Sequence, residues 1–427
     1  MKEDNNLVKV CDAIMGSGKT SATITYINEH PEKKFIYITP YLDEAERIRQ
    51  ACPQAEFVEP NNKDPKYSFS KTNHTAELVR EGRNIASTHQ CLMYYTPEMF
   101  QDIQDQGYTI IIDEEVSILD EEPSVHYGDI EIAVEAGFAE ECSPNEYRIT
   151  EHGKMYQGGV FTPVIKRLRA RSMVCLGNGK KKDVFYWRFS HEMFKVVDEV
   201  IVLTYLFEHS EMEAFFKVYG IEYRAVGISK DESGTYRFCD HKDYIPAYVA
   251  NLDKMLLIEN HDKINEVGRP LHALSMNWYN TKPEEVDQLR KNIYNYFKNR
   301  MSHYPVESRM CGTFKKHWGK IRGKGYWNSD VVFSQKATNA YSDKEVLAYP
   351  VNLFANGKLI TFYANLGHPF DNDRWALSTM LQWIWRSAIR NGKPVWLYLP
   401  SRRMRTLLYK WIEDTQKEYF ERYGKEE

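Results

Sequence analysis

Two glycines followed by a Lys-Thr pair lie near the start of the chain, in the segment DAIMGSGKTSA at residues 12–22. Their spacing fits a phosphate-binding loop (P-loop, or Walker A motif) in the variant that begins with Ala instead of Gly. The matching residues are Ala13, Gly16, Gly18, Lys19 and Thr20. The apolar segment before the loop predicts a buried strand, and residues 20–30 predict a helix, which is the context that this motif requires.

This loop has the chemistry to bind a nucleoside triphosphate. Gly16, Ser17 and Gly18 let backbone N–H groups converge on phosphate oxygens, and the start of the following helix adds a dipole that favours anions. Lys19 is expected to reach the β- and γ-phosphates, and the hydroxyl of Thr20 to bind Mg²⁺. A plain glycine turn is the alternative, and the position of the Lys-Thr pair argues against it.

Two carboxylates follow another apolar segment, YTIIIDEE at residues 108–115. Asp113 and Glu114 are at the carboxyl end of the predicted strand, the edge where ligands bind in an open parallel sheet. Hydrolases with a P-loop need one carboxylate to hold Mg²⁺ and a second to orient the attacking water, and we predict these two roles for this pair. A solvated acidic loop is the alternative, and Glu115 receives no separate role.

Small hydroxyl residues end three other predicted strands of the N-terminal half. They are Thr39, followed by Pro40, then Ser87 and Thr88, followed by His89, and finally Thr204. Hydroxyl groups and free N–H groups at strand ends suit contacts with a phosphate backbone, which position a nucleic-acid strand without reading its bases. Ordinary turn chemistry, and a structural role for the histidine, are the alternatives.

Three polar residues recur every four positions near the C-terminus, in the segment LQWIWRSAIR. Gln382, Arg386 and Arg390 form one polar stripe if residues 373–392 are a helix. Two arginines that point across a cleft at a γ-phosphate would stabilise the charge of phosphoryl transfer when the cleft closes. A solvated face with a cation–π contact between Arg386 and a tryptophan is the alternative.

Two basic segments lie in the same half. Residues 314–327 contain Lys315, Lys316 and Arg322 among other cations, with aromatic residues between them and without an acidic residue. Cations for phosphates and rings for bases are the combination that single-strand binding uses. Arg402 and two further arginines begin the predicted helix at residues 401–423, where an anionic ligand would offset their repulsion by the helix dipole. Solvated loops are the alternative for both segments.

Length and composition predict a globular protein of two or three domains, since the chain has 427 residues, of which 42% are hydrophobic and 14% aromatic. No apolar run reaches the roughly 20 residues of a membrane span, and the N-terminus has no signal-peptide pattern. The seven cysteines are scattered without a C-x-x-C pair, which favours reduced thiols and a cytoplasmic location. A net charge of −4 means that any nucleic-acid surface must be local.

Strands that alternate with helices over residues 1–205 predict an α/β domain with a parallel sheet. An insertion at about 121–198 interrupts it, and in this insertion residues 171–189 predict a β-hairpin with three lysines at its tip, which are expected to be solvated, with a nucleic-acid contact as the alternative. Residues 206–427 predict a second α/β domain. Its predicted strands are 221–228, 269–276, 329–335, 358–367 and 394–400, and its predicted helices are 282–301, 373–392 and 401–423.

The order of these motifs resembles that of superfamily 2 helicases, and the C-terminal part resembles the DEAD/DEAH-like helicases of bacteriophages and integrative elements. The resemblance implies two RecA-like domains with ATP and Mg²⁺ between them and a nucleic-acid strand that crosses both. It implies that Lys19 and Thr20 hold phosphates and metal, and that Thr204 couples the two sites. Thr338 and Asn339 fall where the fifth motif of the family contacts nucleotide or strand.

This sequence departs from the family pattern in its last motif. Trp385 stands where a small residue is usual, and four positions instead of three lead from Arg386 to Arg390, the two arginine-finger candidates. Only twelve residues precede Ala13, which leaves little room for the glutamine motif that selects adenine in some relatives. The preference for ATP is therefore implied by the family alone.

These observations predict an ATP-dependent helicase or translocase that acts on single-stranded or forked DNA, with RNA as an open alternative. Replication or recombination proteins are candidate partners, and no membrane partner is expected. Other functions compatible with the sequence are a packaging-type motor ATPase, a small-molecule kinase, and a nucleotide-switched loader or scaffold without processive turnover.

Overall fold

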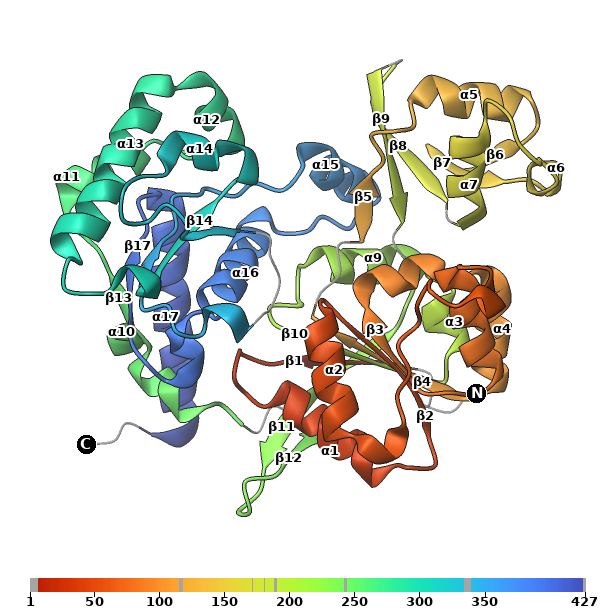
Figure 1. Ribbon diagram of the computed structural model, residues 1–427, viewed down its shortest axis with the longest axis horizontal. Coiled ribbons are helices and arrows are strands. Elements are labelled where there is room, and N and C mark those ends of the chain that lie inside the picture. Colours follow the sequence, from red (N-terminus) through yellow and green to blue (C-terminus); the bar gives the residue numbers. More distant parts are fainter. Residues whose placement is uncertain are drawn as a thin grey trace. The chain divides into compact units, whose positions relative to one another are not determined.

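The computed structural model describes residues 7–114, 118–170, 172–179, 181–187, 190–241, 244–333 and 339–424. The chain divides into two compact units, coloured along the sequence in Figure 1. Unit 1 comprises Met1–Ala13, Gly18–Asp243 and Asn356–Phe370, and unit 2 comprises Ile14–Ser17, Tyr244–Ala355 and Asp371–Glu427. Each unit has a sheet of mainly parallel strands.

Unit 1 is built on a seven-stranded sheet in the order β12-β11-β1-β10-β4-β2-β3. The strands are β1 (Val8–Asp12), β2 (Lys34–Thr39), β3 (Ile85–Thr88), β4 (Tyr108–Asp113), β10 (Glu199–Thr204), β11 (Tyr223–Lys230) and β12 (Tyr236–Cys239). All neighbours pair in parallel except β11 and β12, which form an antiparallel hairpin. β4 is buried along its whole length, which explains its continuous apolar run.

Helices flank this sheet, and they begin in the loops that follow the strands. They are α1 (Lys19–Glu29), α2 (Leu42–Ala51), α3 (Lys71–Arg80), α4 (Pro97–Asp105) and α9 (Glu211–Tyr219). Side chains of α1 and α2 share one hydrophobic core with the sheet, so both helices cover the same face. Because parallel strands end at one edge, the loop after β1 and the carboxylates after β4 lie at the same edge of the sheet.

An inserted subdomain lies between β4 and β10. It contains an antiparallel sheet in the order β5-β9-β8-β7-β6 with a hydrophobic core of its own. Its elements are β5 (Leu119–Glu121), α5 (Tyr127–Glu135), β6 (Ala139–Ser143), β7 (Glu146–Ile149), α6 (Glu151–Lys154), α7 (Thr162–Ala170), β8 (Met173–Asn178) and β9 (Lys181–Trp187), followed by α8 (Met193–Val196). The predicted β-hairpin is therefore confirmed as β8 and β9, although Lys180 at its tip lies outside the described residues.

Unit 2 contains a five-stranded parallel sheet in the order β13-β17-β16-β14-β15. Its strands are β13 (Leu256–Ile258), β14 (Arg309–Thr313), β15 (Asp330–Val332), β16 (Val346–Ala348) and β17 (Val395–Tyr398). Its helices are α10 (Leu252–Met255), α11 (Asp262–Asn265), α12 (Met276–Thr281), α13 (Pro283–Asn295), α14 (Trp318–Ile321), α16 (Asn372–Ile384) and α17 (Arg402–Tyr423). The predicted fold class, two α/β domains with parallel sheets and an insertion in the first, is confirmed.

The structure corrects three details of this prediction. The first unit continues to Asp243 instead of ending at residue 205, because β11 pairs with β1 and extends its sheet. Residues 269–276, predicted as a strand, form turns that lead into α12. Residues 358–367, also predicted as a strand, lie mostly in helix α15 (Gly357–Asn365), which belongs to unit 1 and packs against β8. Within the described ranges, no helix has the length and apolarity needed to cross a membrane.

Glu199, at the amino end of β10, joins three neighbouring elements of unit 1. Its carboxylate accepts hydrogen bonds from Lys9, from Lys33 at 2.8 Å, from Tyr26 at 2.6 Å and from Thr109 at 3.0 Å. Burial by itself would raise the pKa of Glu199, but the hydrogen bonds from the two lysines and the tyrosine together lower it to about 2.

Replacing Glu199 with Gln is expected to lower the free energy of unfolding by about 2 kcal/mol at neutral pH, because two ammonium groups lose their counter-charge. The pKa in the folded state lies below the ordinary value of about 4.3, so this stabilisation is present above that value and is lost as the pH falls toward 2. Urea unfolding near pH 7 and near pH 3 should show a smaller difference between variant and wild type at acid pH.

The control variant is Glu46→Gln, which breaks an exposed pair with Arg49 and is expected to change stability by less than about 0.5 kcal/mol. A difference between Glu199→Gln and wild type that stays the same at both pH values would contradict the ionic origin of the effect.

Candidate nucleotide-binding site

The predicted phosphate-binding loop connects β1 to α1. Gly16 and Gly18 have φ angles of 75° and 92°, in the left-handed region that favours glycine. Ser17 is buried, and its N–H donates to the carbonyl oxygen of Ile14 at 3.2 Å. α1 begins at Lys19, directly after these glycines. The N–H groups of a first helical turn have no partner within the helix, so this turn provides donors for a phosphate.

The ammonium group of Lys19 donates a hydrogen bond to the carbonyl oxygen of Ala13 within the same loop. Burial lowers the pKa of Lys19 below that of a free lysine, while the Cys11 thiol and the Asp113 carboxylate act in the opposite direction. The ammonium group therefore lies within electrostatic reach of the predicted metal-binding carboxylate. Thr20, the predicted Mg²⁺ ligand in the loop, follows in the same turn and is partly buried.

Asp113 is the last residue of β4 and is buried. One oxygen of its carboxylate accepts a hydrogen bond of 2.5 Å from the hydroxyl of Tyr37 on β2, a partner that the sequence did not predict. Burial and the adjacent Glu114 raise the pKa of Asp113 to about 7, although the Tyr37 hydrogen bond and the Lys19 charge partly offset this rise. A divalent cation at this carboxylate would favour its ionised form.

Glu114 turns the chain sharply at the end of β4. Its φ angle is 65°, which is uncommon for a residue with a side chain. Its N–H donates to the carbonyl oxygen of Leu203 at 2.9 Å, and this bond holds the strained conformation. The Oε2 atom of Glu114 is buried without a hydrogen-bond partner among the described residues. Strain of this kind is concentrated at functional sites, and here it leaves a buried acceptor available for a water molecule.

The neighbouring strands add polar groups to the same edge. The N–H of Ala13 donates to the carbonyl oxygen of Thr204 at 3.1 Å, so β10 holds the start of the loop. In the described part of the chain, the buried Oγ1 atoms of Thr204 and of Thr39 have no hydrogen-bond partner. Buried polar atoms are costly unless a partner satisfies them. Together with the loop glycines, Lys19 and Asp113, they fit the phosphates of a nucleoside triphosphate with Mg²⁺.

Two further residues position this edge. Asp12, which the sequence analysis did not single out, accepts hydrogen bonds from the N–H groups of Leu206 at 2.8 Å and Phe207 at 3.1 Å, and so fixes the chain that leaves β10. His89 is buried, and its Nε2 lies 2.8 Å from the carbonyl oxygen of Asp113. His89 therefore connects the end of β3 to the carboxylates, in addition to its predicted place on the path of a nucleic-acid strand.

The SPbeta prophage-derived uncharacterized protein YonV of Bacillus subtilis (strain 168) is 32% identical to this chain over 414 residues, which cover 95% of this chain and 99% of that protein. The chain belongs to the YonV family. A family model described as the YonV C-terminal Rossmann-like domain matches residues 250–412, which include most of unit 2.

Two solved structures are also similar to this chain. Xpd4 from S. tokodaii is 11% identical, covers 95% of this chain and 94% of its own, and has a TM-score of 0.48. A structure titled XPD helicase is 11% identical, with coverage of 97% and 95% and a TM-score of 0.41.

The predicted polar stripe of unit 2 does not exist as one helix face. α16 ends at Ile384, because the hydroxyl of Ser387 donates to the Ile384 carbonyl oxygen at 2.6 Å and the N–H of Ala388 donates to Lys344 instead. Gln382 is therefore in α16, whereas Arg386 follows the helix and Arg390 lies in the separate turn η11 (Ala388–Asn391).

The two arginine-finger candidates of unit 2 differ in exposure. Arg386 is only 2% exposed; burial raises the pKa of Tyr349 well above its ordinary value, and the charge of Arg386 partly offsets this rise. Arg390 is exposed, and Gln382 is partly buried. Arg390 is thus the arginine whose guanidinium group is accessible without a rearrangement of unit 2.

The remaining predicted nucleic-acid contacts fall into three groups. Pro40 and Thr88 are partly buried at strand ends of unit 1. Thr338 lies outside the described residues, and Asn339 begins the turn η10 (Asn339–Tyr341) with a side chain that is also outside them. Arg402 is exposed at the start of α17, after the N-cap residue Ser401.

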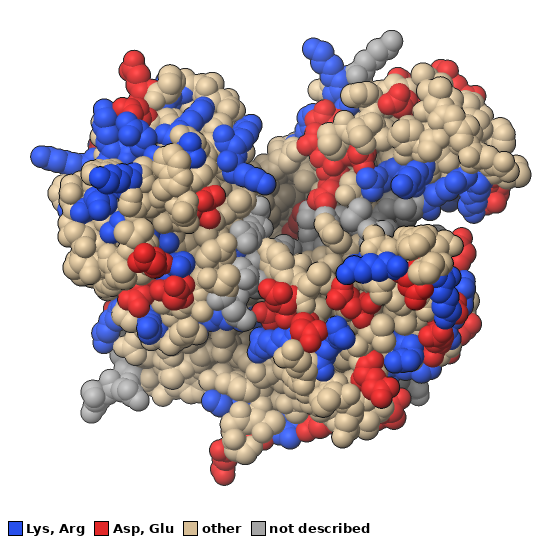
Figure 2. Space-filling view, viewed as in Figure 1, with Lys and Arg blue, Asp and Glu red and all other residues tan. Residues whose placement is uncertain are grey.

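A basic surface covers the part of unit 2 that contains α13 and α14, where Figure 2 shows Lys and Arg side chains gathered on the visible face. Lys315, Lys316 and Arg322 are exposed there. The guanidinium carbon of Arg322 lies 3.8 Å from the ring centre of Trp327, which is 54% exposed. The other aromatic residues of this segment, Phe314, Trp318 and Tyr326, are buried in the core of unit 2, so only one ring of the predicted alternation is available to a base.

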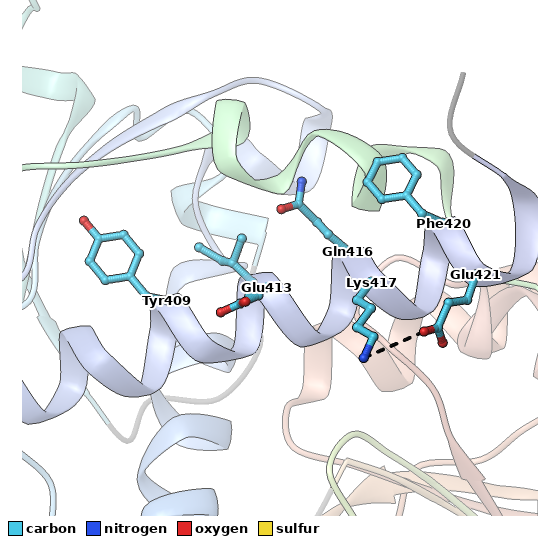
Figure 3. A pocket seen from close by; sticks show the side chains of 7 residues that line it. Tyr409, Glu413, Gln416, Lys417, Phe420 and Glu421 are labelled. Carbon is cyan, nitrogen blue, oxygen red and sulfur yellow. Dashed lines mark ion pairs between the residues drawn. The ribbon is translucent and has the colours of Figure 1, made fainter. Parts of the chain in front are cut away.

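An open groove of about 770 Å³ runs along α17 in unit 2 (Figure 3). All of its lining residues belong to this one helix: Tyr409, Ile412, Glu413, Gln416, Lys417, Phe420 and Glu421. Lys417 and Glu421 form an ion pair of 3.8 Å along the helix. Because polar groups from other elements do not converge on it, we assign no ligand to this groove.

Proposed function

We propose that this protein is an ATP-dependent nucleic-acid translocase or helicase, with DNA as its substrate. The observation that carries the proposal is the meeting of the loop lysine and two carboxylates at one sheet edge, where Lys19, Asp113 and Glu114 act on one another electrostatically. Bound ATP would supply the phosphoanhydride bond that is hydrolysed. Mg²⁺ would neutralise negative charge on the phosphate oxygens.

Each residue of the site has a defined task in this proposal. Lys19 and the N–H groups of the loop hold the phosphates, and Thr20 and Asp113 face the metal. Glu114 orients the attacking water through its buried carboxylate oxygen. Arg390, the exposed arginine of the last motif, would stabilise the charge of the transition state.

The same edge connects hydrolysis to movement on nucleic acid. His89 contacts the Asp113 carbonyl oxygen and directly follows Thr88, a residue that we place on the path of the strand. A change at the carboxylates when the phosphate leaves would therefore reach the end of β3. The basic surface with Arg322 and Trp327 would hold a second stretch of the strand, through phosphate contacts and ring stacking.

The direct test measures ATP hydrolysis without nucleic acid and with single-stranded DNA, single-stranded RNA and forked duplex. We expect hydrolysis that single-stranded DNA stimulates. Hydrolysis under none of these conditions would overturn the proposal, and ATP binding that alters DNA affinity without turnover would favour a switched loader. DNA cleavage that depends on Mg²⁺ or Mn²⁺ would favour a packaging-type motor.

The basic surface gives the proposal a quantitative test. Combined replacement of Lys315, Lys316 and Arg322 by Ala is expected to weaken single-stranded DNA binding by roughly tenfold or more and to reduce the slope of log K against log salt by about 2, since about 0.7 is lost for each phosphate contact. ATP hydrolysis without DNA should stay at the wild-type rate.

The matched control for this test removes three exposed cations of α17, in the combined replacement of Lys410, Lys417 and Arg422 by Ala. It changes the net charge equally and should leave DNA binding within about twofold of wild type. Equal loss in both triple variants would show that overall charge, not this surface, determines DNA affinity.

A further inference from the structure

Tyr236, the first residue of β12, lies against the phosphate-binding loop. A Cβ atom at Gly18 would come within 2.2 Å of Cδ1 and 2.5 Å of Cε1 of Tyr236, so the edge of the ring occupies the space that another residue would need there. The φ of 92° at Gly18 independently favours glycine. An aromatic ring from a distant part of the chain thus fills the space beside Gly18, the last glycine of the loop.

The hairpin that carries Tyr236 is fixed to α1. Arg237 donates to the carboxylate of Glu29, the last residue of α1, at 2.8 and 3.1 Å. Phe238 packs edge to face on Tyr26 of the same helix, with ring centres 5.9 Å apart. Tyr236 and Phe238 are two residues apart in a strand, so both side chains lie on the side of α1. The ring of Tyr236 therefore has a defined position at the start of α1.

The order of the strands gives a direction to a triphosphate in the loop. Asp113 and Glu114 follow β4, on one side of β1, whereas Tyr236 begins β12, on the other side. The γ-phosphate would lie on the carboxylate side, because Asp113 and Glu114 would hold the metal and the attacking water there. The α-phosphate and the nucleoside consequently extend toward β11 and β12.

We propose that Tyr236 forms the platform on which the nucleobase of the triphosphate packs, an inference that rests on the proposed nucleotide hydrolysis. The side chain of Tyr236 is partly buried, and the ammonium group of Lys230, its partner across the hairpin, lies over the ring at 5.2 Å from its centre. This positive charge lies on the nucleoside side of the loop and suits the α-phosphate or the base. Stacking on a ring is open to every base, so ATP and GTP should bind with similar affinity.

The test measures binding by titration calorimetry with three probes: ATP, GTP and inorganic tripolyphosphate. Tyr236→Ala is expected to raise the Kd of ATP and of GTP by about tenfold, the order that stacking on an aromatic ring contributes. Tripolyphosphate has no base, so its Kd should stay within about twofold of wild type. Tyr236→Phe keeps the ring and should bind all three probes like wild type.

Tyr236→Leu fills the space beside Gly18 without an aromatic face, and it replaces the alanine variant if that variant melts at a lower temperature than wild type. If the variants without the ring lose affinity for ATP and for tripolyphosphate equally, Tyr236 only supports the structure of the loop, and the inference is overturned. Unchanged ATP affinity in the leucine variant would also overturn it. A wild-type protein that binds neither ATP nor GTP would instead refute the proposed function itself.

Discussion

Replacing Glu114 with Gln is expected to lower the turnover of ATP by about 10²- to 10⁴-fold, the range that a positioned general base contributes. The amide has the size of the carboxylate but cannot accept a proton from water. The strained backbone at this residue is held by the hydrogen bond from its N–H to Leu203, which the substitution leaves in place. The fold around β4 should therefore be unaffected, and the loss should appear in kcat.

Two measurements separate this role from a general loss of structure. Steady-state hydrolysis should give a strongly reduced kcat, while calorimetric titration with ATP should give a Kd within about threefold of wild type, because the loop and Asp113 remain. Glu121→Gln, which removes an exposed carboxylate on β5 of the same unit, is the matched control and should keep wild-type turnover. Wild-type turnover in Glu114→Gln would mean that another group orients the water.

The local part of this site could be read from the sequence. The strand, loop and helix at residues 8–29 are encoded by neighbouring residues, since an apolar run, two glycines and a helical segment follow one another. The position of Asp113 at a strand end was predictable for the same reason. The hydrogen bond to Tyr37 was not, because this tyrosine lies in an apolar strand and reaches the carboxylate only through the parallel pairing of β2 with β4.

Non-local pairing also explains the errors in domain organisation. β11 has the pattern of a strand in any sheet, and only its pairing with β1 assigns it to unit 1. β13 and β16 have three residues each, which is too short for a periodic pattern to appear. Residues 358–367 are rich in β-branched and aromatic residues, which favours a strand, but Asn356 caps the helix by accepting from the N–H of Lys358.

The break after α16 changes the interpretation of the C-terminal arginines. A spacing of four residues predicts one helix face only where the helix continues, and the side chain of Ser387 ends it by bonding to a carbonyl oxygen three residues earlier. The family resemblance treats Arg386 and Arg390 alike, but only Arg390 is exposed.

Lys19→Ala is expected to lower kcat/KM for ATP by about 10³-fold or more, because it removes the only cation of the loop from the phosphates on which charge develops. The ammonium group of Lys19 is held over the loop by the Ala13 carbonyl oxygen, where it is ready to exchange this acceptor for a phosphate oxygen. Burial separates this ammonium group from water and so lowers its pKa, and an ammonium group with less water around it interacts more strongly with an anion.

Hydrolysis should be measured with saturating single-stranded DNA, so that a defect in DNA binding does not hide the effect, and thermal melting should confirm that the variant is folded. Lys410→Ala, which removes an exposed lysine of α17, is the control and should keep wild-type kcat/KM. Because the proposed role of this lysine is to contact the phosphates and not the base, the affinity for tripolyphosphate should fall together with that for ATP, in contrast to the variants of Tyr236. Full activity of Lys19→Ala would assign the hydrolysis to a different site, and the loop after β1 would then have only a structural role.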